Sequence, residues 1–158
     1  MTSQTTALMT DRARVIIEHL ARGDLRKETA RILGIAESSL YREIATTCRK
    51  LDIPVRTAAA VNTALSKQLI TLPPGEPVDL TKAQIDVLRL IAAGRGTSEI
   101  AAMYGIAPDT VRYHVGRIRK ALGARHRAHA VALGWQRGIL GPSEKPPSSS
   151  APAAPPAG

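Results

Sequence analysis

The chain has 158 residues, enough for one ordinary domain or two very small ones, and its formal net charge of +9 favours an acidic partner. The sequence has no apolar run near the ~18 residues of a membrane span, no secretory signal at its start, and one cysteine, which excludes an intramolecular disulfide. Aromatic residues are scarce, with one Trp, three Tyr and no Phe, so base stacking on aromatic platforms is disfavoured. We therefore expect a cytoplasmic protein, and the basic charge favours a nucleoid-associated one.

Helical periodicity dominates the first half of the chain, and no stretch alternates like a half-buried strand. The pattern predicts helices over 11–22, 26–33 and 37–51, followed by a longer one over about 55–70. "TLPPGEPVD" at 71–79 has three prolines and a glycine, which is typical of a linker. We expect disorder in residues 1–9 and in the Pro/Ala/Ser-rich tail 141–158, because such a tail cannot bury a core.

The helical pattern restarts after the linker. Thr81 and Gln84 have the spacing of a capping box, and a first helix follows with one apolar face and a stop at Gly94. Further helices are predicted over about 98–104, 108–122 and 127–139. Sliding the chain by 71 residues aligns the two halves without a gap, and 12 of 61 positions are identical. Many of the identities fall on glycines and small residues, so we interpret 10–70 and 80–140 as two copies of one domain.

Each copy has a short helix, a glycine-centred turn and a second helix, which is the plan of a helix-turn-helix. In the second copy, Gly105 tolerates the turn and Pro108 suits the first position of a helix. One face of 108–122 is apolar and should be buried: Val111, Val115, Ile118 and Leu122. The other faces carry Asp109, Thr110, Arg112, Tyr113, Gly116, Arg117, Arg119 and Lys120, and no acid occurs from 110 to 143.

These motifs are recognisable. Residues 80–133, with the pieces "LT", "IAAG", "EIA", "GIAPDTVRYHV" and "AVAL", resemble the LuxR/FixJ-type (GerE-like) helix-turn-helix domain of bacterial transcription regulators. The first copy, with "ETARILGI" and "SSLYREI", is similar to a diverged relative of that domain. The resemblance implies that Thr110 and Arg117 touch phosphates, that Arg112 and Tyr113 face base edges, and that the last helix forms a dimer interface.

On this basis the predicted DNA-binding residues of the second copy are Thr97, Ser98, Asp109, Thr110, Arg112, Tyr113, Gly116, Arg117, Lys120 and Arg127. In the first copy they are Ser38, Ser39, Tyr41, Arg42 and Arg49. The predicted dimer interface comprises Ala128, Val131, Ala132 and Trp135. The first copy departs further from the family pattern, since Glu43 stands where the second copy has His114, and Thr47 where it has Ile118.

The sequence thus predicts an all-α protein of two tandem four-helix helix-turn-helix domains. Its predicted function is that of a sequence-specific regulator of transcription that binds double-stranded DNA, either as a homodimer or as an intramolecular pseudo-dimer. We expect no enzyme, since no nucleophile–base set, phosphate loop or carboxylate pair is evident, and no metal, cofactor or membrane. Two alternatives stay open: a factor associated with RNA polymerase, similar to sigma region 4, and an accessory protein of recombination, replication or plasmid maintenance.

Overall fold

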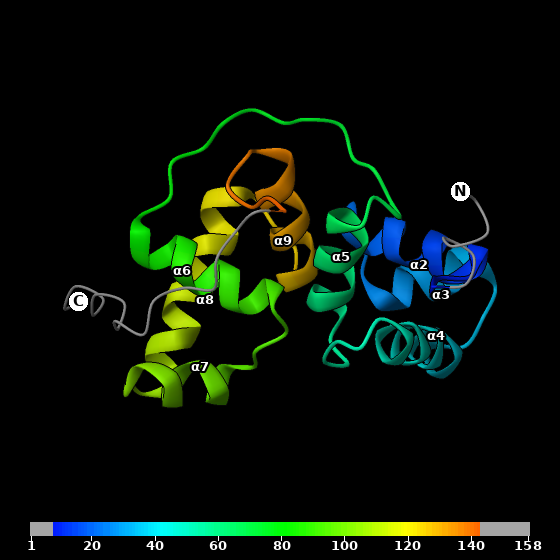
Figure 1. Cartoon of the computed structure of the whole chain (residues 1–158), viewed down its shortest axis with the longest axis horizontal. Helices are drawn as coiled ribbons and strands as arrows, with labels where there is room; N and C mark the ends of the chain where they lie inside the picture. The colour runs from blue at the N-terminus through cyan, green and yellow to red at the C-terminus, as the bar shows by residue number, and fades with distance from the viewer. Residues whose placement is uncertain (1–7, 143–158) are drawn as a thin grey trace.

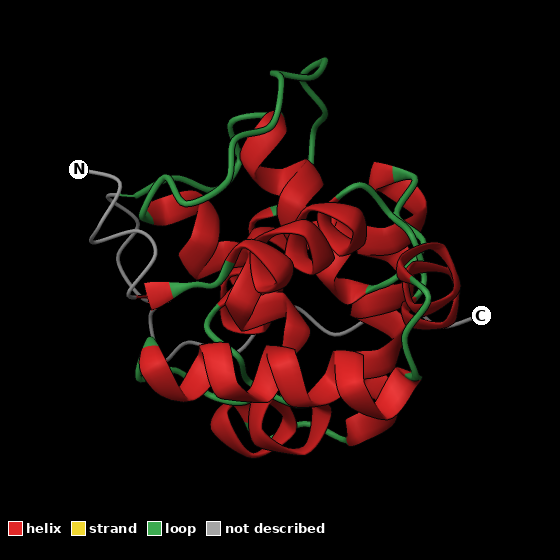
Figure 2. Cartoon of the chain, turned by 90° about the vertical axis from the view of Figure 1, so that its right-hand side faces the viewer, coloured by secondary structure: helices red, strands yellow, loops and turns green. Residues whose placement is uncertain are grey.

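A computed structural model describes residues 8–142, in which all regular structure is helical (Figures 1 and 2). The helices in chain order are α2 (Asp11–Ala21), α3 (Arg26–Leu33), α4 (Glu37–Lys50), α5 (Thr57–Ser66), α6 (Lys82–Ala92), α7 (Thr97–Tyr104), α8 (Pro108–Leu122) and α9 (Arg127–Gln136). The all-helical prediction is confirmed for this part of the chain. The predicted disorder of residues 1–7 and 143–158 falls outside the described residues.

Local signals in the sequence explain several of these boundaries. Thr10 and Thr81 cap α2 and α6, each accepting a hydrogen bond from an N–H of the first turn, and the Thr81–Gln84 capping box is present. Gly105, between α7 and α8, has a φ of 63°, in the left-handed region where glycine is unstrained. Pro108 stands at the start of α8, as predicted.

Four predicted boundaries are wrong. The helix expected over 55–70 spans only Thr57–Ser66, because Arg56 is extended and Gln68 takes a φ of 57°, which ends the helix. The chain then folds back, so that the N–H of Leu69 donates to the carbonyl of Ala64 and its side chain is buried. The helix α9 ends at Gln136 rather than at 139 by a similar reversal at Gly138. The ordered part also begins before residue 10, since Met9 is buried in the core.

The helices α2–α5 and α6–α9, here called the N-terminal and C-terminal halves, have matching sizes. Their lengths are 11, 8, 14 and 10 residues in the first and 11, 8, 15 and 10 in the second. The fourth helices of the two halves, α5 and α9, pack against each other at the centre, with α8 and α4 on opposite sides of this pair (Figure 1). One continuous apolar core runs through both halves.

Polar contacts reinforce the seam, by which we mean the interface between the two halves. The guanidinium of Arg125 donates to both carboxylate oxygens of Glu28 at 2.9 Å and to the carbonyl of Gly23 at 3.1 Å. This hydrogen bonding lowers the pKa of Glu28 to about 2. The indole N–H of Trp135 donates to the Asn62 side-chain oxygen at 2.8 Å. The seam therefore combines apolar packing with specific hydrogen bonds.

The segment 71–79 contains no helix, consistent with a linker, and arches from α5 to α6 past the C-terminal end of α9 (Figure 1). It is held there by two hydrogen bonds. The N–H of Gly75 donates to the carbonyl of Gln136 at 2.8 Å, and the Gln136 side chain donates to the carbonyl of Pro73 at 2.9 Å. No helix within residues 8–142 has both the length and the apolar character to cross a bilayer.

Candidate nucleic-acid interface

The helix α8 is fixed by its apolar stripe, and this leaves its other faces free. Val111, Val115, Ile118 and Leu122 are all buried, as predicted, against α6, α7 and α9. The opposite faces expose Asp109, Arg112, Tyr113, Gly116, Arg117, Arg119 and Lys120, while Thr110 is half-buried. A helix held in this way presents four cations and one acid to solvent.

The exposed cations of α8 differ in how they are restrained. Arg112 donates to the carboxylate of Asp109 at 2.6 Å, one turn earlier, and both side chains are exposed. Arg119 donates to the carbonyl of Arg125, which ties it to the loop before α9. A Cβ added at Gly116 would meet nothing within 4 Å, so its exposed surface is open to close approach. The face predicted from periodicity is therefore exposed and mostly cationic, and it is open at Gly116.

Thr97 and Arg127, predicted to act together with α8, are brought side by side. The guanidinium of Arg127, the first residue of α9, donates to the hydroxyl of Thr97, the first residue of α7. Ser98 is exposed beside them. Burial lowers the pKa of Arg127, and the neighbouring Arg56, Arg119 and Arg112 lower it further by repulsion. This cluster adds a cation and two hydroxyl groups at the start of α7.

The comparisons with known proteins agree with this geometry. Residues 78–133, which contain α6, α7, α8 and the start of α9, match the family model described as bacterial regulatory proteins, luxR family. This part of the chain is a LuxR-type helix-turn-helix domain. The matched residues belong to the C-terminal half and to the end of the segment that precedes it.

Relatives of the LuxR-type domain include the transcriptional activator protein PhzR of Pseudomonas fluorescens, 39% identical over 62 residues, 37% of this chain. The probable transcriptional regulatory protein NarL of Mycobacterium tuberculosis is 40% identical over 67 residues, 42% of this chain. The transcriptional regulatory protein YdfI of Bacillus subtilis is 38% identical over 61 residues, 39% of this chain. The chain covers between 25% and 31% of these relatives' own lengths. No solved structure matches it.

The predicted residues of the N-terminal half lie on α4, apart from the LuxR-type domain. Ser38, Tyr41, Arg42 and Arg49 are exposed and Ser39 is half-buried, and Tyr41 is 51% exposed. The exposed and half-buried surface of α4 also carries Glu37 and Glu43, so it is less cationic than that of α8. Thr47 is buried, and its hydroxyl donates a hydrogen bond to the carbonyl of Glu43 at 2.8 Å.

The residues predicted to form a dimer interface are engaged within the chain. Ala128, Val131 and Ala132 are buried, and Trp135 bonds to Asn62 of α5. The principal neighbour of α9 is α5, the fourth helix of the other half. The surface that the family resemblance assigns to dimerisation is therefore already covered by a helix of the same chain.

Two further side chains lie in the core. His114 of the LuxR-type domain is 6% exposed, so it packs internally and does not face outward with Tyr113. Cys48 is fully buried, and burial raises the pKa of its thiol, despite the neighbouring Arg49. Within residues 8–142, no group of three or more His, Cys, Asp or Glu side chains is placed to hold a metal ion.

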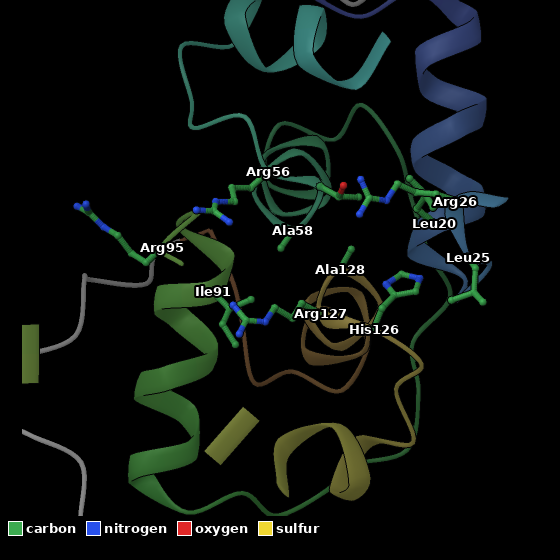
Figure 3. A pocket seen from close by; sticks show the side chains of 11 residues that line it. Leu20, Leu25, Arg26, Arg56, Ala58, Ile91, Arg95, His126, Arg127 and Ala128 are labelled. Carbon is green, nitrogen blue, oxygen red and sulfur yellow. The ribbon is translucent and has the colours of Figure 1, made fainter. Parts of the chain in front are cut away.

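The sequence prediction missed a group of cations at the seam. Arg26 of α3, Arg56 before α5 and Arg95 after α6 line a cavity together with Arg127 (Figure 3). One signal was available: Arg56 falls on Arg127 when the chain is shifted by 71 residues. That alignment alone does not show that equivalent residues of the two halves meet at one place.

Proposed function

We propose that the protein is a sequence-specific regulator of transcription that binds double-stranded DNA. The observation that carries this proposal is the outer face of α8, which exposes Arg112, Arg117, Arg119 and Lys120 within a LuxR-type domain. A single α-helix fits the major groove of B-form DNA, where base edges are distinguishable. The relatives PhzR, NarL and YdfI are named as activators or regulators of transcription.

In this proposal the two kinds of contact have different sources. Arg117, Thr110, Thr97, Ser98 and Arg127 neutralise or hydrogen-bond phosphates, which provides most of the affinity and sets the register of α8. Arg112 and Tyr113 face base edges, with Asp109, Gly116 and Lys120 beside them. Arg112 must leave its intrahelical bond to Asp109 to donate to a base, and exposed ion pairs of this kind are weak enough to exchange.

We further propose that the N-terminal half is a diverged helix-turn-helix domain and that the chain is an intramolecular pseudo-dimer. Helices α2, α3 and α4 begin 71 residues before α6, α7 and α8, and Gly34 repeats the left-handed turn of Gly105. The packing of α5 on α9 favours the pseudo-dimer over a homodimer through α9, because the required surface is covered. Each half then contributes one helix, α4 or α8, and linkage raises the effective concentration of the second contact.

The regulator proposal is tested by selecting binding sites from random duplexes with the full chain, then measuring affinity and salt dependence with variants. Arg112→Ala should relax sequence preference at one or two positions. Arg117→Ala should weaken binding to all sequences and lower the salt slope by about one. Lys67→Ala removes an exposed cation at the far end of α5 and is the matched control. Binding no tighter than roughly micromolar for every duplex at physiological salt would contradict the proposal.

A further inference from the structure

A cavity of about 350 Å³ opens at the seam, between the beginnings of α5 and α9 (Figure 3). We call it the seam cavity. Its apolar lining comes from both halves: Leu20 and Ala58 from the N-terminal half, and Ile91 and Ala128 from the C-terminal half. Ala58 and Ala128 lie between Arg56 and Arg127 on one side and Arg26 and His126 on the other. A cavity of this size accommodates a small organic molecule.

The charged lining of the seam cavity is almost entirely cationic. Among residues 8–142, Glu99 is the one carboxylate within ion-pair distance of its arginines, 3.2 Å from Arg95 and 3.9 Å from Arg56. Arg127 bonds to a neutral hydroxyl. Two of the four arginines therefore pair with the one carboxylate, and neither Arg26 nor Arg127 lies within ion-pair distance of it.

This excess of positive charge is partly withdrawn from water. Arg127 and His126 are half-buried, and in both the pKa is lowered first by burial and then by repulsion from neighbouring arginines. Crowded like charges in a partly desolvated place are costly, and an anion bound among them relieves that cost. Guanidinium groups also bind carboxylate, sulfonate and phosphate groups with paired hydrogen bonds.

We propose that the seam cavity binds one small organic anion, with its acidic group held by Arg56 and Arg127 and a compact apolar body against Leu20, Ile91, Ala58 and Ala128. The apolar lining favours a free small molecule over a DNA phosphate, because a phosphodiester backbone has no apolar body to place there. The ligand would contact both halves at once, so its binding free energy adds to the stability of the seam. This inference does not depend on the proposed function.

The test uses the fluorescent probe 1-anilinonaphthalene-8-sulfonate, which joins a sulfonate to an apolar ring system, titrated into the full chain at physiological salt. We expect a saturable rise in fluorescence with one site per chain. Arg56→Gln should weaken binding at least about tenfold, as loss of a charge-assisted hydrogen bond does. Arg31→Gln, which removes an exposed cation of α3 outside the cavity, is the matched control and should leave the titration unchanged.

Ala58→Leu provides a second variant, because it fills the cavity and keeps every charge. It should abolish the probe's saturable signal. If Ala58→Leu does not fold, Arg56→Gln alone tests the proposal. Unsaturable binding, equal weakening by Arg31→Gln, or an unchanged titration with Arg56→Gln would overturn the proposal.

A DNA titration of the same variants separates the two proposals. If Arg56→Gln lowers the salt slope for duplex DNA by about one but leaves the probe titration unchanged, the seam arginines serve DNA phosphates. The ligand proposal is then wrong and the regulator proposal stands. If the probe behaves as expected and no duplex binds better than roughly micromolar, the seam cavity stands and the regulator proposal falls.

Discussion

The two halves of the chain fold into helices of nearly equal length around equivalent glycine turns, yet they present different surfaces. The outer face of α8 has four cations and one acid, whereas α4 balances Arg42, Arg49 and Lys50 against Glu37 and Glu43. The family model matches the C-terminal half alone. The two halves therefore share a helix arrangement but differ in the charge of the surface that each presents.

The sharpest way to break this comparison is to place a glutamate at equivalent positions of α8 and α4. Arg117 and Thr46 are both exposed and stand 71 residues apart. Arg117→Glu should weaken duplex binding about a hundredfold, since it replaces a phosphate contact with repulsion. Thr46→Glu should weaken it about fivefold or less, because α4 already carries acids. Fluorescence anisotropy with a selected duplex at several salt concentrations measures both.

Equal losses in these two variants would contradict the difference between the halves. They would show that α4 approaches the backbone as closely as α8 does. The circular dichroism of each variant should match that of the original chain, because both positions are exposed on long helices.

Glycine substitutions test whether the seam or the turns matter more for stability. Gly94 has a φ of 89°, and a Cβ there would lie 2.9 Å from Pro54 across the seam. Gly94→Ala should therefore lower the free energy of unfolding by about 2–4 kcal/mol, from backbone strain and overpacking together. Gly105→Ala is the matched control: its φ is 63° and its Cβ position is open, so only a strain of about 1 kcal/mol applies. Urea unfolding gives both free energies. Similar losses of stability in the two variants would mean that the packing at the seam accommodates the added Cβ.

The sequence predicted the helix boundaries well where a local signal sets them. Pro108 begins α8, Thr81 caps α6 and a glycine turn separates α7 from α8, so these boundaries follow from backbone chemistry. The end of α5 did not follow, because the apolar residues Leu69 and Ile70 continue the helical pattern although the chain reverses at Gln68. Their burial is achieved by folding back rather than by one more helical turn.

The outer face of α8 could be predicted because a helix with a buried stripe has a determined opposite face. The seam cavity could not, since its arginines come from α3, the residue before α5, the loop after α6 and the start of α9. Only the packing of one half on the other brings these residues together. Likewise, nothing in the local sequence shows that Arg125 reaches Glu28, 97 residues away.

We expect acid to destabilise the part of the seam that the start of α9 forms. His126 caps α9 by accepting at Nδ1 from the N–H of His129, and its Nε2 lies 2.9 Å from the carbonyl of Asp24, so the neutral form fits both bonds. Burial, with repulsion from Arg119, Arg125 and Arg26, lowers the pKa of His126. A lowered pKa means that its contribution is present above the ordinary histidine value and is lost as pH falls through the folded value.

We therefore expect wild-type stability to decline as the pH falls below the ordinary histidine pKa of 6.5, because the cap of α9 is lost. Loss of a cap costs about 1 kcal/mol, a fall of about 2–4 °C in Tm for a chain of this size. His126→Asn keeps a capping oxygen that does not titrate, and its Tm should depend less on pH. His129, whose pKa is also lowered by burial, provides the remaining dependence. Identical pH profiles for the two proteins would exclude His126 as a cause.

The smallest predicted effect is a gain in stability at the end of α4. Asp52 has a φ of 55°, and the equivalent position in the C-terminal half is Gly123, with a φ of 70°. Glycine is unstrained at this φ, whereas aspartate is strained. Part of that strain is offset because the unfolded chain has less conformational entropy with aspartate than with glycine. Asp52→Gly should therefore stabilise the chain by about 0.5–1 kcal/mol, and Gly123→Asp should destabilise it by a similar amount. Since Asp52 is exposed, urea unfolding reports mainly the backbone term. A loss of stability in Asp52→Gly would contradict this prediction and would show that Asp52 stabilises the N-terminal half.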